Sequence, residues 1–187
     1  MIRQSMSVIV IVSKLPYEHP GTLIPRIAYR HFSSFDSLLD VGSGEGLIGE
    51  GVWKVPHIAS LDIFPPKNPG RNFTLGNALY AVQIYGAKSF DVVQCGEMIE
   101  HMTKEDGLRL LPVLEEVARK FVIITTPEGF TDQDPEKFPD EPWRDNPYQK
   151  HLSGFSVEDF TERGYTCMIN GVEERVPQII AWKVVQQ

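Results

Sequence analysis

The amino-acid sequence predicts a doubly wound α/β fold, in which helices cover both faces of a mainly parallel sheet. Along the 187 residues, short apolar runs of strand length alternate with segments of helical periodicity, the order expected of βαβ units. In addition, the apolar run 38–41 leads into the glycine-rich loop 42–46 before apolar residues resume, as happens where a buried strand turns sharply into a helix. A chain of this length with 42% apolar residues suffices for a single domain with its own core.

The first elements lie on either side of this loop. Residues 7–13 are rich in β-branched side chains and predict a short strand or an extended arm, and residues 1–21 are taken as an N-terminal arm. Residues 22–32 predict a helix with Thr22 as its N-cap and Pro25 in its first turn. Further strands are expected at 38–41, 57–63 and 72–75, and helices at 47–53 and 78–85.

The second half of the chain continues the alternation. A long amphipathic helix is expected at 104–120, with apolar residues along one face and Pro112 as a candidate kink. A shorter helix at 156–163 begins at Ser156, and Asp159 three residues later resembles the partner in a capping box. The remaining strands are expected at 90–95, 121–125, 165–170 and 178–185, the last two as an antiparallel pair.

Two connections depart from a regular alternation. Residues 64–71 contain three prolines and a glycine, which forbid a regular helix and predict an extended crossover loop. One face of the sheet is then either thinly covered or covered by the N-terminal arm. Residues 128–154 predict an insertion, either an ordered lid over an acceptor site or a packed surface loop. This insertion contains four aromatic residues, Phe130, Phe138, Trp143 and Tyr148.

Composition excludes several classes of function. The net charge of −7 argues against broad nonspecific binding to nucleic acid, which needs a basic surface, but a local basic patch stays compatible with it. Cys95 and Cys167 lie far apart in apolar runs, which indicates buried free thiols and no metal or redox motif. The apolar run 8–12 is too short to span a membrane or to act as a signal peptide. We therefore expect a cytoplasmic protein that does not enter the membrane.

The glycine loop predicts a ligand site, and two kinds of ligand compete for it. Gly44-x-Gly46-x-x-Gly49 fits the dinucleotide fingerprint, but two extra residues separate the strand from its first glycine. Asp40 would also bring a carboxylate close to a pyrophosphate, which is electrostatically unfavourable. S-adenosylmethionine, with its ammonium, sulfonium and carboxylate groups, suits an acid followed by a bare peptide loop better. The pattern Asp40-x-Gly42-x-Gly44-x-Gly46 resembles the first motif of the class I (Rossmann-like) methyltransferases.

This resemblance covers about residues 36–185. It implies a seven-stranded sheet with a reversed last strand and a cofactor beyond the carboxyl ends of the strands. Asp62 matches the family's ribose acid, because one carboxylate can accept both ribose hydroxyls, although an aspartate there also suits a turn. Ile63 would pack on the adenine, and Asn77 would face the adenine amino group or cap the next helix. The predicted cofactor-binding residues are Asp40, Gly42, Ser43, Gly44, Gly46, Asp62, Ile63, Asn77, Ala78, Cys95 and Gly96.

A cluster of acidic and histidine residues follows the predicted strand 90–95. In Glu97-x-x-Glu100-His101, positions i, i+3 and i+4 share one face of a helical turn, and two such close carboxylates repel each other unless a cation or a shared proton neutralises them. A divalent metal (Mg²⁺, Mn²⁺, Fe²⁺ or Zn²⁺) held by Glu97, Glu100, His101 and His151 is one solution. Without a metal, His101 or His151 would act as a general base with a pKa near neutral.

This pattern resembles two groups of enzymes, the small-RNA 3′-terminal 2′-O-methyltransferases and the ubiquinone-pathway O-methyltransferases. The resemblance implies a metal that holds the acceptor hydroxyls and lowers their pKa. It makes Glu97, His101 and His151 the candidate catalytic residues. Many small class I methyltransferases, however, carry Glu-His at this place and use no metal.

Together these observations predict a methyltransferase that uses S-adenosylmethionine and acts on a hydroxyl oxygen of a small molecule. Metal-assisted 2′-O-methylation of an RNA 3′ end ranks second, because the chain is acidic and lacks an added RNA-binding domain. N-methylation of a small amine also fits. A nucleotide-sugar or NAD-dependent oxidoreductase is disfavoured by Asp40 and by the missing substrate domain. The non-enzymatic alternative is a regulatory protein that binds the cofactor without turnover.

Overall fold

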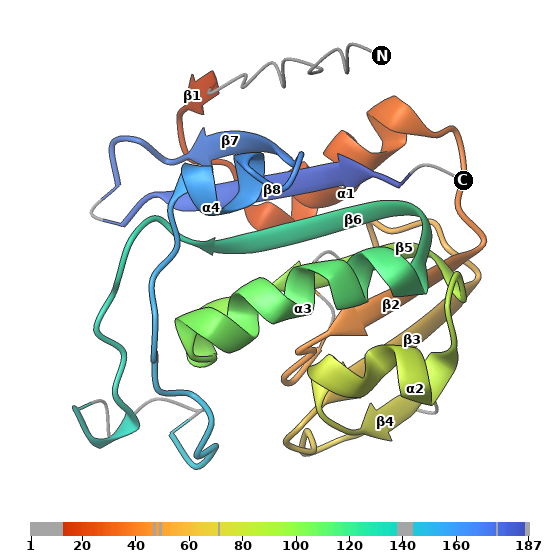
Figure 1. Ribbon diagram of the computed structural model, residues 1–187, viewed down its shortest axis with the longest axis horizontal. Helices are drawn as coiled ribbons and strands as arrows, with labels where there is room; N and C mark the ends of the chain where they lie inside the picture. The colour runs from red at the N-terminus through yellow and green to blue at the C-terminus, as the bar shows by residue number, and fades with distance from the viewer. Residues whose placement is uncertain are drawn as a thin grey trace, which may run out of the picture.

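A sheet of eight strands, in the order β1-β7-β8-β6-β5-β2-β3-β4, organises the molecule (Figure 1). The computed structural model describes residues 13–46, 48, 50–70, 72–137, 144–174 and 176–185. The strands are β1 (Ser13–Leu15), β2 (Ser37–Val41), β3 (His57–Asp62), β4 (Phe73–Leu75), β5 (Phe90–Gly96), β6 (Ala118–Pro127), β7 (Thr166–Asn170) and β8 (Gln178–Val184). The predicted fold is confirmed: β2 to β8 form the seven-stranded sheet, and β1 adds a short strand at one edge.

Strand direction decides where a ligand can bind. The neighbouring strands from β4 to β6 are parallel to one another, and β8 runs antiparallel to both β6 and β7. The reversed last strand and the antiparallel pair β7–β8 are therefore confirmed. The carboxyl ends of β2, β3 and β5 meet at one edge of the sheet, which is the usual ligand-binding edge of such folds.

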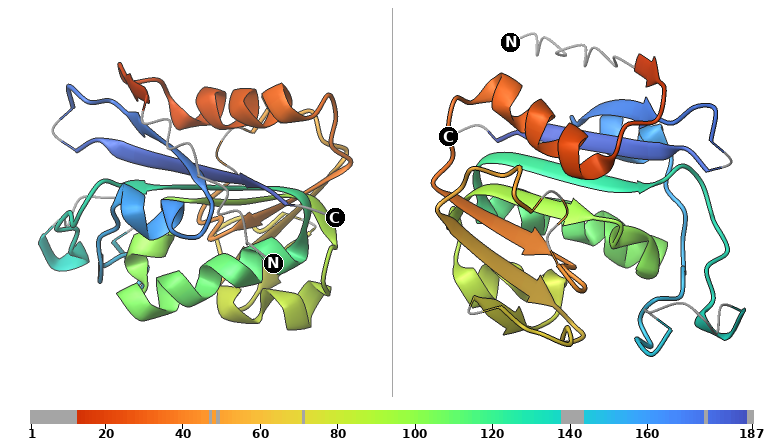
Figure 2. Two further views of the ribbon diagram at one scale, coloured as in Figure 1. Left: turned by 45° about the horizontal axis from the view of Figure 1, so that its top comes forward. Right: turned by 180° about the vertical axis from the view of Figure 1, so that it is seen from behind.

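Helices cover both faces of the sheet (Figure 2). The helical segments are α1 (Pro20–His31), η1 (Ala78–Tyr80), α2 (Ala81–Tyr85), η2 (Ile99–His101), α3 (Lys104–Val117), η3 (Pro135–Lys137) and α4 (Val157–Thr161). Helix α1 lies on one face, and α2, α3 and α4 lie on the other. Among the described residues, no helix is both long and apolar enough to cross a membrane.

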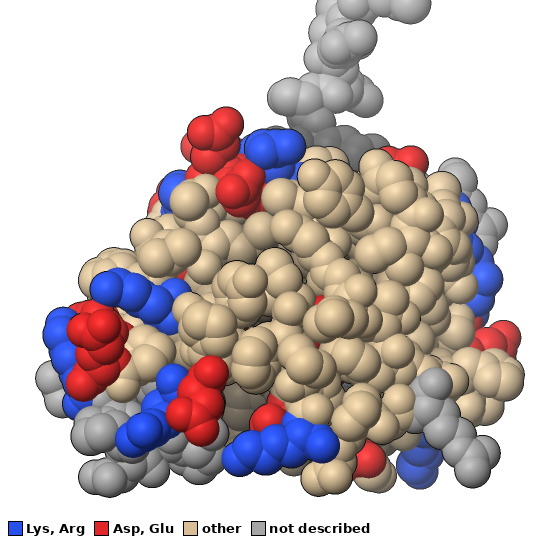
Figure 3. Space-filling model, turned by 90° about the horizontal axis from the view of Figure 1, so that it is seen from below, with Lys and Arg blue, Asp and Glu red and all other residues tan. Residues whose placement is uncertain are grey.

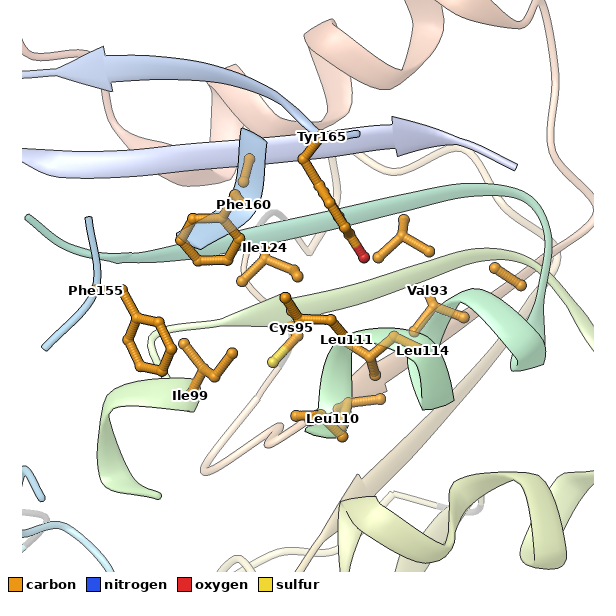
Figure 4. Packing of buried hydrophobic residues seen from close by; sticks show 14 of the residues in the cluster. Val93, Cys95, Ile99, Leu110, Leu111, Leu114, Ile124, Phe155, Phe160 and Tyr165 are labelled. Carbon is orange, nitrogen blue, oxygen red and sulfur yellow. The ribbon is translucent and has the colours of Figure 1, made fainter. Parts of the chain in front are cut away.

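Each face of the sheet has its own apolar core. The larger core packs α3 and α4 on β5, β6 and β7, with Phe155, Phe160 and Tyr165 among its fully buried side chains (Figure 4). Cys95 lies inside this core and Cys167 is also buried, so the prediction of two buried free thiols is confirmed. The second core joins α1 to the opposite face through an aromatic group that includes Phe35 and Trp53.

Residues 47–53 do not form the predicted helix. In the described part of this segment, 48 and 50–53 adopt turns and loop. Gly51 has a φ of +80°, which an α-helix does not contain, and Gly49 is a second poor helix former in the sequence. Trp53 is buried and its indole Nε1 donates to Oε1 of Gln94 on β5 at 3.0 Å, so a side chain anchors the segment to the sheet in place of a helical face.

Two predicted helix ends also differ. Helix α1 begins at Pro20 and not at residue 22, because the His19 side chain, in place of Thr22, caps it by accepting from the Gly21 N–H at 3.1 Å. Helix α3 ends at Val117 and β6 begins directly at Ala118. The side chains of Arg119 and Lys120 reach Asp91 on β5 at 2.8 and 2.9 Å, which favours a strand over a last helical turn there. The predicted capping box of Ser156 and Asp159 opens α4.

The proline-rich crossover is confirmed as a loop over its described residues, 64–70. A shallow hollow lies against β3 and β4 on the face that a crossover helix would cover, with Ile58, Ser60 and Phe73 among its walls. Strand β1 pairs with β7, at the edge opposite β4, so the described part of the N-terminal arm does not cover this hollow. Residues 1–12, and with them most of the predicted strand 7–13, lie outside the described residues.

Candidate active site

A cavity of about 320 Å³ opens at the carboxyl ends of β2, β3 and β5. Every predicted cofactor-binding residue lines it except Cys95, whose side chain points into the core. The sequence pattern placed Cys95 at the correct strand end but not on the correct face, because alternate residues of a strand point to opposite faces. Sequence reasoning missed several other lining residues, namely Ile48, Leu61, Gly76, Met98, Met102, Asn146 and Gln149.

Asp40 is the buried acid of the cavity, with a side chain only 2% exposed. Its Oδ1 accepts a hydrogen bond from Nε2 of Gln94 at 3.2 Å, and the same amide nitrogen donates to the Ile48 carbonyl at 3.1 Å. Burial raises the pKa of Asp40 from 3.8 to about 7, against the hydrogen bond from Gln94, and the nearby Asp62 raises it further. A cationic ligand group beside Asp40 would therefore restore the charged carboxylate.

The Asp40→Asn variant is expected to be more stable than the wild type at about pH 8, by roughly 2–4 kcal/mol. An acid whose pKa is raised on folding stabilises the folded state at low pH, and this contribution is lost as the pH rises from 3.8 through about 7. Asparagine removes the buried charge and keeps the acceptor for Gln94. Urea unfolding at several pH values measures the difference, which should shrink toward pH 4. A variant less stable than the wild type at pH 8 would contradict the assignment.

Asp62 ends β3 and ties the glycine loop to the sheet. Its Oδ2 accepts from the Gly44 N–H and its Oδ1 from the Phe64 N–H, both at 2.8 Å. Gly42, at φ +72°, lies directly under Met98, because a Cβ atom there would stand 2.1 Å from the Met98 Cγ. The loop is thus held close to β3 and β5, and only glycine permits this contact. Asp62 thus stabilises the turn after β3 through its hydrogen bonds to backbone N–H groups, and it also lines the cavity.

Asn77 and Ile63 lie near Asp62 on the same wall. The Asn77 side chain accepts from the Leu79 N–H at 2.9 Å and so caps η1, which is the capping role that the sequence offered. The residue also lines the cavity. Ile63 is 42% exposed, which leaves an apolar surface free to pack against a flat ligand group. The lining of the cavity therefore includes a carboxylate, an amide and an apolar side chain from the ends of two neighbouring strands, β3 and β4.

Glu97 does not share a helical face with Glu100 and His101, as the i, i+3, i+4 spacing predicted. Its φ is +50°, in the left-handed region, and the 3₁₀ turn η2 starts only at Ile99. The Glu97 carboxyl group instead accepts from Nε2 of Gln178 at 3.1 Å, and burial raises its pKa. A residue outside helical dihedrals cannot follow helical spacing, so the predicted set of four ligands loses this member.

Glu100, His101 and His151 do come together. One ligand atom from each lies within 4.8 Å of the others, and the two imidazole rings meet edge to face at a centroid distance of 4.7 Å. His101 Nδ1 lies 3.3 Å from the Lys150 carbonyl, and His151 Nδ1 lies 2.7 Å from the Thr131 carbonyl. Because a carbonyl only accepts, these contacts favour the tautomer with the proton on Nδ1, which leaves the lone pair on Nε2.

The electrostatics of this cluster differ from a general-base arrangement. Burial, with the neighbouring His151, lowers the pKa of His101 to about 4, so the predicted near-neutral value is wrong for this ring. Burial, with the nearby Glu97, raises the pKa of Glu100 to about 8, and Thr126 donates to this carboxyl group at 3.0 Å. Two neutral imidazoles and one carboxyl group, with the rings oriented through Nδ1, form a donor set that suits a divalent metal.

The described parts of residues 128–154 are two segments, 128–137 and 144–154, which run side by side beyond the sheet (Figure 1). The His151 N–H donates to the Gln133 carbonyl at 3.0 Å, and Gly154 packs against the backbone of Phe130. Asn146, Tyr148 and Gln149, from the segment 144–154, line the cavity. Phe138 and Trp143 lie outside the described residues.

Carboxylates dominate the charge of the cavity. Asp40, Asp62 and Glu97 line it, and no lysine or arginine is among the lining residues that the structure describes. Lys137 pairs with Asp132 and Lys150 pairs with Asp134, so these two cations of the 128–154 segment are neutralised within it. Figure 3 shows basic and acidic side chains intermixed on the side where this segment lies, while uncharged residues cover most of the middle of this face.

No protein-family model and no curated protein matches the chain. Solved structures do match. The 1,6-didemethyltoxoflavin-N1-methyltransferase of Burkholderia thailandensis, in complex with its substrate and S-adenosylhomocysteine, has 13% identity and a TM-score of 0.61 over 91% of this chain and 80% of that one. The N-methyltransferase NodS of Bradyrhizobium japonicum WM9 has 12% identity and a TM-score of 0.61 over 90% and 95% of the two chains.

The small-RNA methyltransferase HEN1 also matches, with 18% identity and a TM-score of 0.54 over 92% of this chain but 28% of that one. At such identities the similarity establishes the fold, which this chain shares with methyltransferases that depend on S-adenosylmethionine. The predicted fold is thereby confirmed, and the activity has to be argued from the site.

Proposed function

We propose that this chain transfers the methyl group of S-adenosylmethionine to a hydroxyl oxygen of a small molecule. The observation that carries the proposal is the cavity at the ends of β2, β3 and β5, walled by two aspartates and a glycine loop, with no lysine or arginine among its described lining residues. Such a site favours a ligand that has a cationic centre, and it disfavours a pyrophosphate. S-adenosylmethionine has a sulfonium and an ammonium group, and dinucleotides have neither.

Each part of the cofactor has a counterpart in the wall. The ribose hydroxyls would bind the Asp62 carboxylate, and the adenine would pack on Ile63 with its amino group toward Asn77. The ammonium group and sulfonium would lie on the side of Asp40, where they favour the ionised form of a carboxyl group whose pKa is otherwise raised. A sulfonium transfers its methyl group without a covalent intermediate on the enzyme. Holding the acceptor atom in line with the methyl–sulfur bond therefore supplies most of the rate enhancement.

The choice of oxygen as the accepting atom depends on the cluster of Glu100, His101 and His151. These residues would hold a divalent metal such as Mg²⁺, Mn²⁺, Fe²⁺ or Zn²⁺, which lowers the pKa of a bound hydroxyl. His101 and His151 are oriented for this role by the carbonyls of Lys150 and Thr131. N-methylation would not require such a donor set, because a neutral amine is already a good nucleophile, whereas a hydroxyl becomes one only as it loses its proton.

An RNA 3′ end remains the second candidate acceptor, since the metal cluster would serve a terminal ribose as well. The charge of the site favours a small molecule over it. Phosphates need a cationic surface, whereas the described cavity wall carries only carboxylates and the lysines of the 128–154 segment are paired. A lid role for this segment, which contributes Asn146, Tyr148 and Gln149 to the wall, belongs to the same proposal.

Calorimetric titration with S-adenosylhomocysteine and with NAD tests the cofactor assignment. We expect S-adenosylhomocysteine to bind with a dissociation constant in the micromolar range. NAD should bind at least about 100-fold more weakly, because NAD lacks the α-amino group of the homocysteine part and carries two phosphates. Tighter binding of NAD would overturn the proposal in favour of an oxidoreductase. Binding of S-adenosylhomocysteine without methyl transfer to any of a panel of phenols, catechols and polyols would instead favour the non-enzymatic alternative.

A further inference from the structure

Glu97 has features that neither the cofactor assignment nor the metal cluster uses. It is a non-glycine residue with φ +50°, a conformation that costs energy and is kept mainly where function requires it. Its backbone N–H donates to the Thr125 carbonyl at 2.9 Å, which fixes this turn directly after β5. The residue lines the cavity together with its chain neighbours Met98, His101 and Met102, which follow the end of β5, whereas Asp62 ends β3. Glu97 thus faces the part of the cavity left for the methyl acceptor.

A chain of amide groups leads from the N-terminal arm to this carboxyl group. Asn170, at the end of β7, is fully buried and makes two hydrogen bonds with the backbone of Glu18: its Oδ1 accepts from the N–H at 2.9 Å, and its Nδ2 donates to the carbonyl at 2.8 Å. The same Nδ2 lies 3.4 Å from Oε1 of Gln178, which pairs with Asn170 in the register of β7 and β8. Nε2 of Gln178 then donates to Oε1 of Glu97 at 3.1 Å.

The orientation of every amide in this chain is determined. A backbone N–H cannot accept and a backbone carbonyl cannot donate, so the two bonds with Glu18 leave Asn170 a single orientation. Its second amide hydrogen then points to Gln178, which must present its carbonyl oxygen there and its NH₂ group to Glu97. Glu97 therefore always receives a donor on Oε1, and the nearby Thr125 hydroxyl also favours its ionised form. Each carboxylate oxygen has two lone pairs, so the group can still accept a hydrogen bond from a ligand.

We propose that Glu97 recognises the methyl acceptor by accepting a hydrogen bond from its O–H or N–H group, and that Asn170 and Gln178 are positioning residues that hold the carboxyl group for this task. The inference rests on the proposed methyl transfer and narrows its substrate class. The acceptor is a neutral or cationic compound with a free hydrogen-bond donor at or beside the accepting atom. Anionic groups are rejected because the carboxyl group repels them, and fully substituted ethers or amines are disfavoured because they offer no donor to the partly buried carboxyl group beyond the one from Gln178.

Phenol and anisole test this recognition, since anisole carries a methyl group in place of the hydroxyl hydrogen of phenol and so lacks the donor, while variants at Glu97 and Gln178 control for the added size. The methyl groups of Met98 and Met102, labelled with ¹³C at Cε, report on the cavity by NMR in the protein loaded with S-adenosylhomocysteine. We expect phenol to shift these signals and to bind about tenfold more tightly than anisole. Glu97→Gln keeps an acceptor for Gln178 but turns an NH₂ group to the ligand, so the preference should disappear. Gln178→Leu should reduce it several-fold.

The ratio of the two affinities separates recognition from a general loss of structure, because a loosened cavity would weaken both probes alike. Gln83→Leu, an exposed glutamine on α2, is the matched control and should keep the wild-type ratio. Equal binding of phenol and anisole to the wild type, absence of any shift at Met98 and Met102, or a preference that survives Glu97→Gln would each overturn the proposal. Failure of S-adenosylhomocysteine to bind, with the preference for phenol intact in the free protein, would overturn the methyltransferase assignment, and the role of Glu97 would be reduced to recognition of a donor on some other ligand.

Discussion

Replacing Asp62 by alanine is expected to weaken the binding of S-adenosylhomocysteine by about 100-fold or more, since two charge-assisted hydrogen bonds to the ribose are lost. Asp62 also accepts the N–H groups of Gly44 and Phe64 at 2.8 Å, so the variant loosens the glycine loop as well. Isothermal calorimetry measures the effect directly and requires no knowledge of the methyl acceptor.

A second ligand and a second variant separate these two contributions. 5′-Methylthioadenosine contains the ribose and adenine but no amino acid, so Asp62→Ala should weaken it nearly as much as S-adenosylhomocysteine. Asp40→Asn, on the neighbouring strand β2, should weaken only the ligand with the ammonium group. If Asp40→Asn reduces the affinity for both ligands equally, or if Asp62→Ala spares 5′-methylthioadenosine, the placement of the cofactor along the wall is wrong.

Local patterns predicted those parts of the site that depend on a strand end. Asp40 and Asp62 could be located from the sequence, because each terminates an apolar run and parallel strands bring their carboxyl ends to one edge. The antiparallel pair β7–β8 and the capping box of Ser156 were likewise set by residues near one another in the chain. In each case the physical cause acts over a few residues, so periodicity and capping rules are sufficient.

Local sequence patterns could not predict contacts between residues that lie far apart in the chain. The helical spacing predicted one shared face for Glu97, Glu100 and His101, but Glu97 lies apart from that face, because its backbone is fixed by Thr125 on β6 and its side chain by Gln178 on β8. Gln178 follows Glu97 by 81 positions and carries no motif, so only the sheet register reveals its role. The prediction of a helix at 47–53 was wrong for the same reason, because Trp53 is held by Gln94 on the distant strand β5.

Removal of the imidazoles should have the second large effect. Wild-type protein is expected to bind Mn²⁺ or Zn²⁺ at one site, and His101→Ala or His151→Ala should each lower that affinity by about 100-fold or more, since each removes a ligand and leaves only two protein donors. Calorimetric titration of the metal-free protein at constant pH measures the change. Exhaustive chelation should also abolish methyl transfer to an identified acceptor, and added metal should restore it.

Glu97 provides the discriminating control, because the sequence pattern and the structure disagree about it. If the four-residue pattern of the sequence were correct, Glu97→Gln would weaken the metal as much as His151→Ala does. Of the four predicted ligands, all of which lie in the described part of the chain, Glu100, His101 and His151 have ligand atoms within 4.8 Å of one another, so Glu97→Gln should change the metal affinity less than about threefold. Turnover that is unaffected by chelation would exclude the metal altogether. His101, with a pKa of about 4 and therefore neutral at pH 7, would then be left as a hydrogen-bond partner of the acceptor.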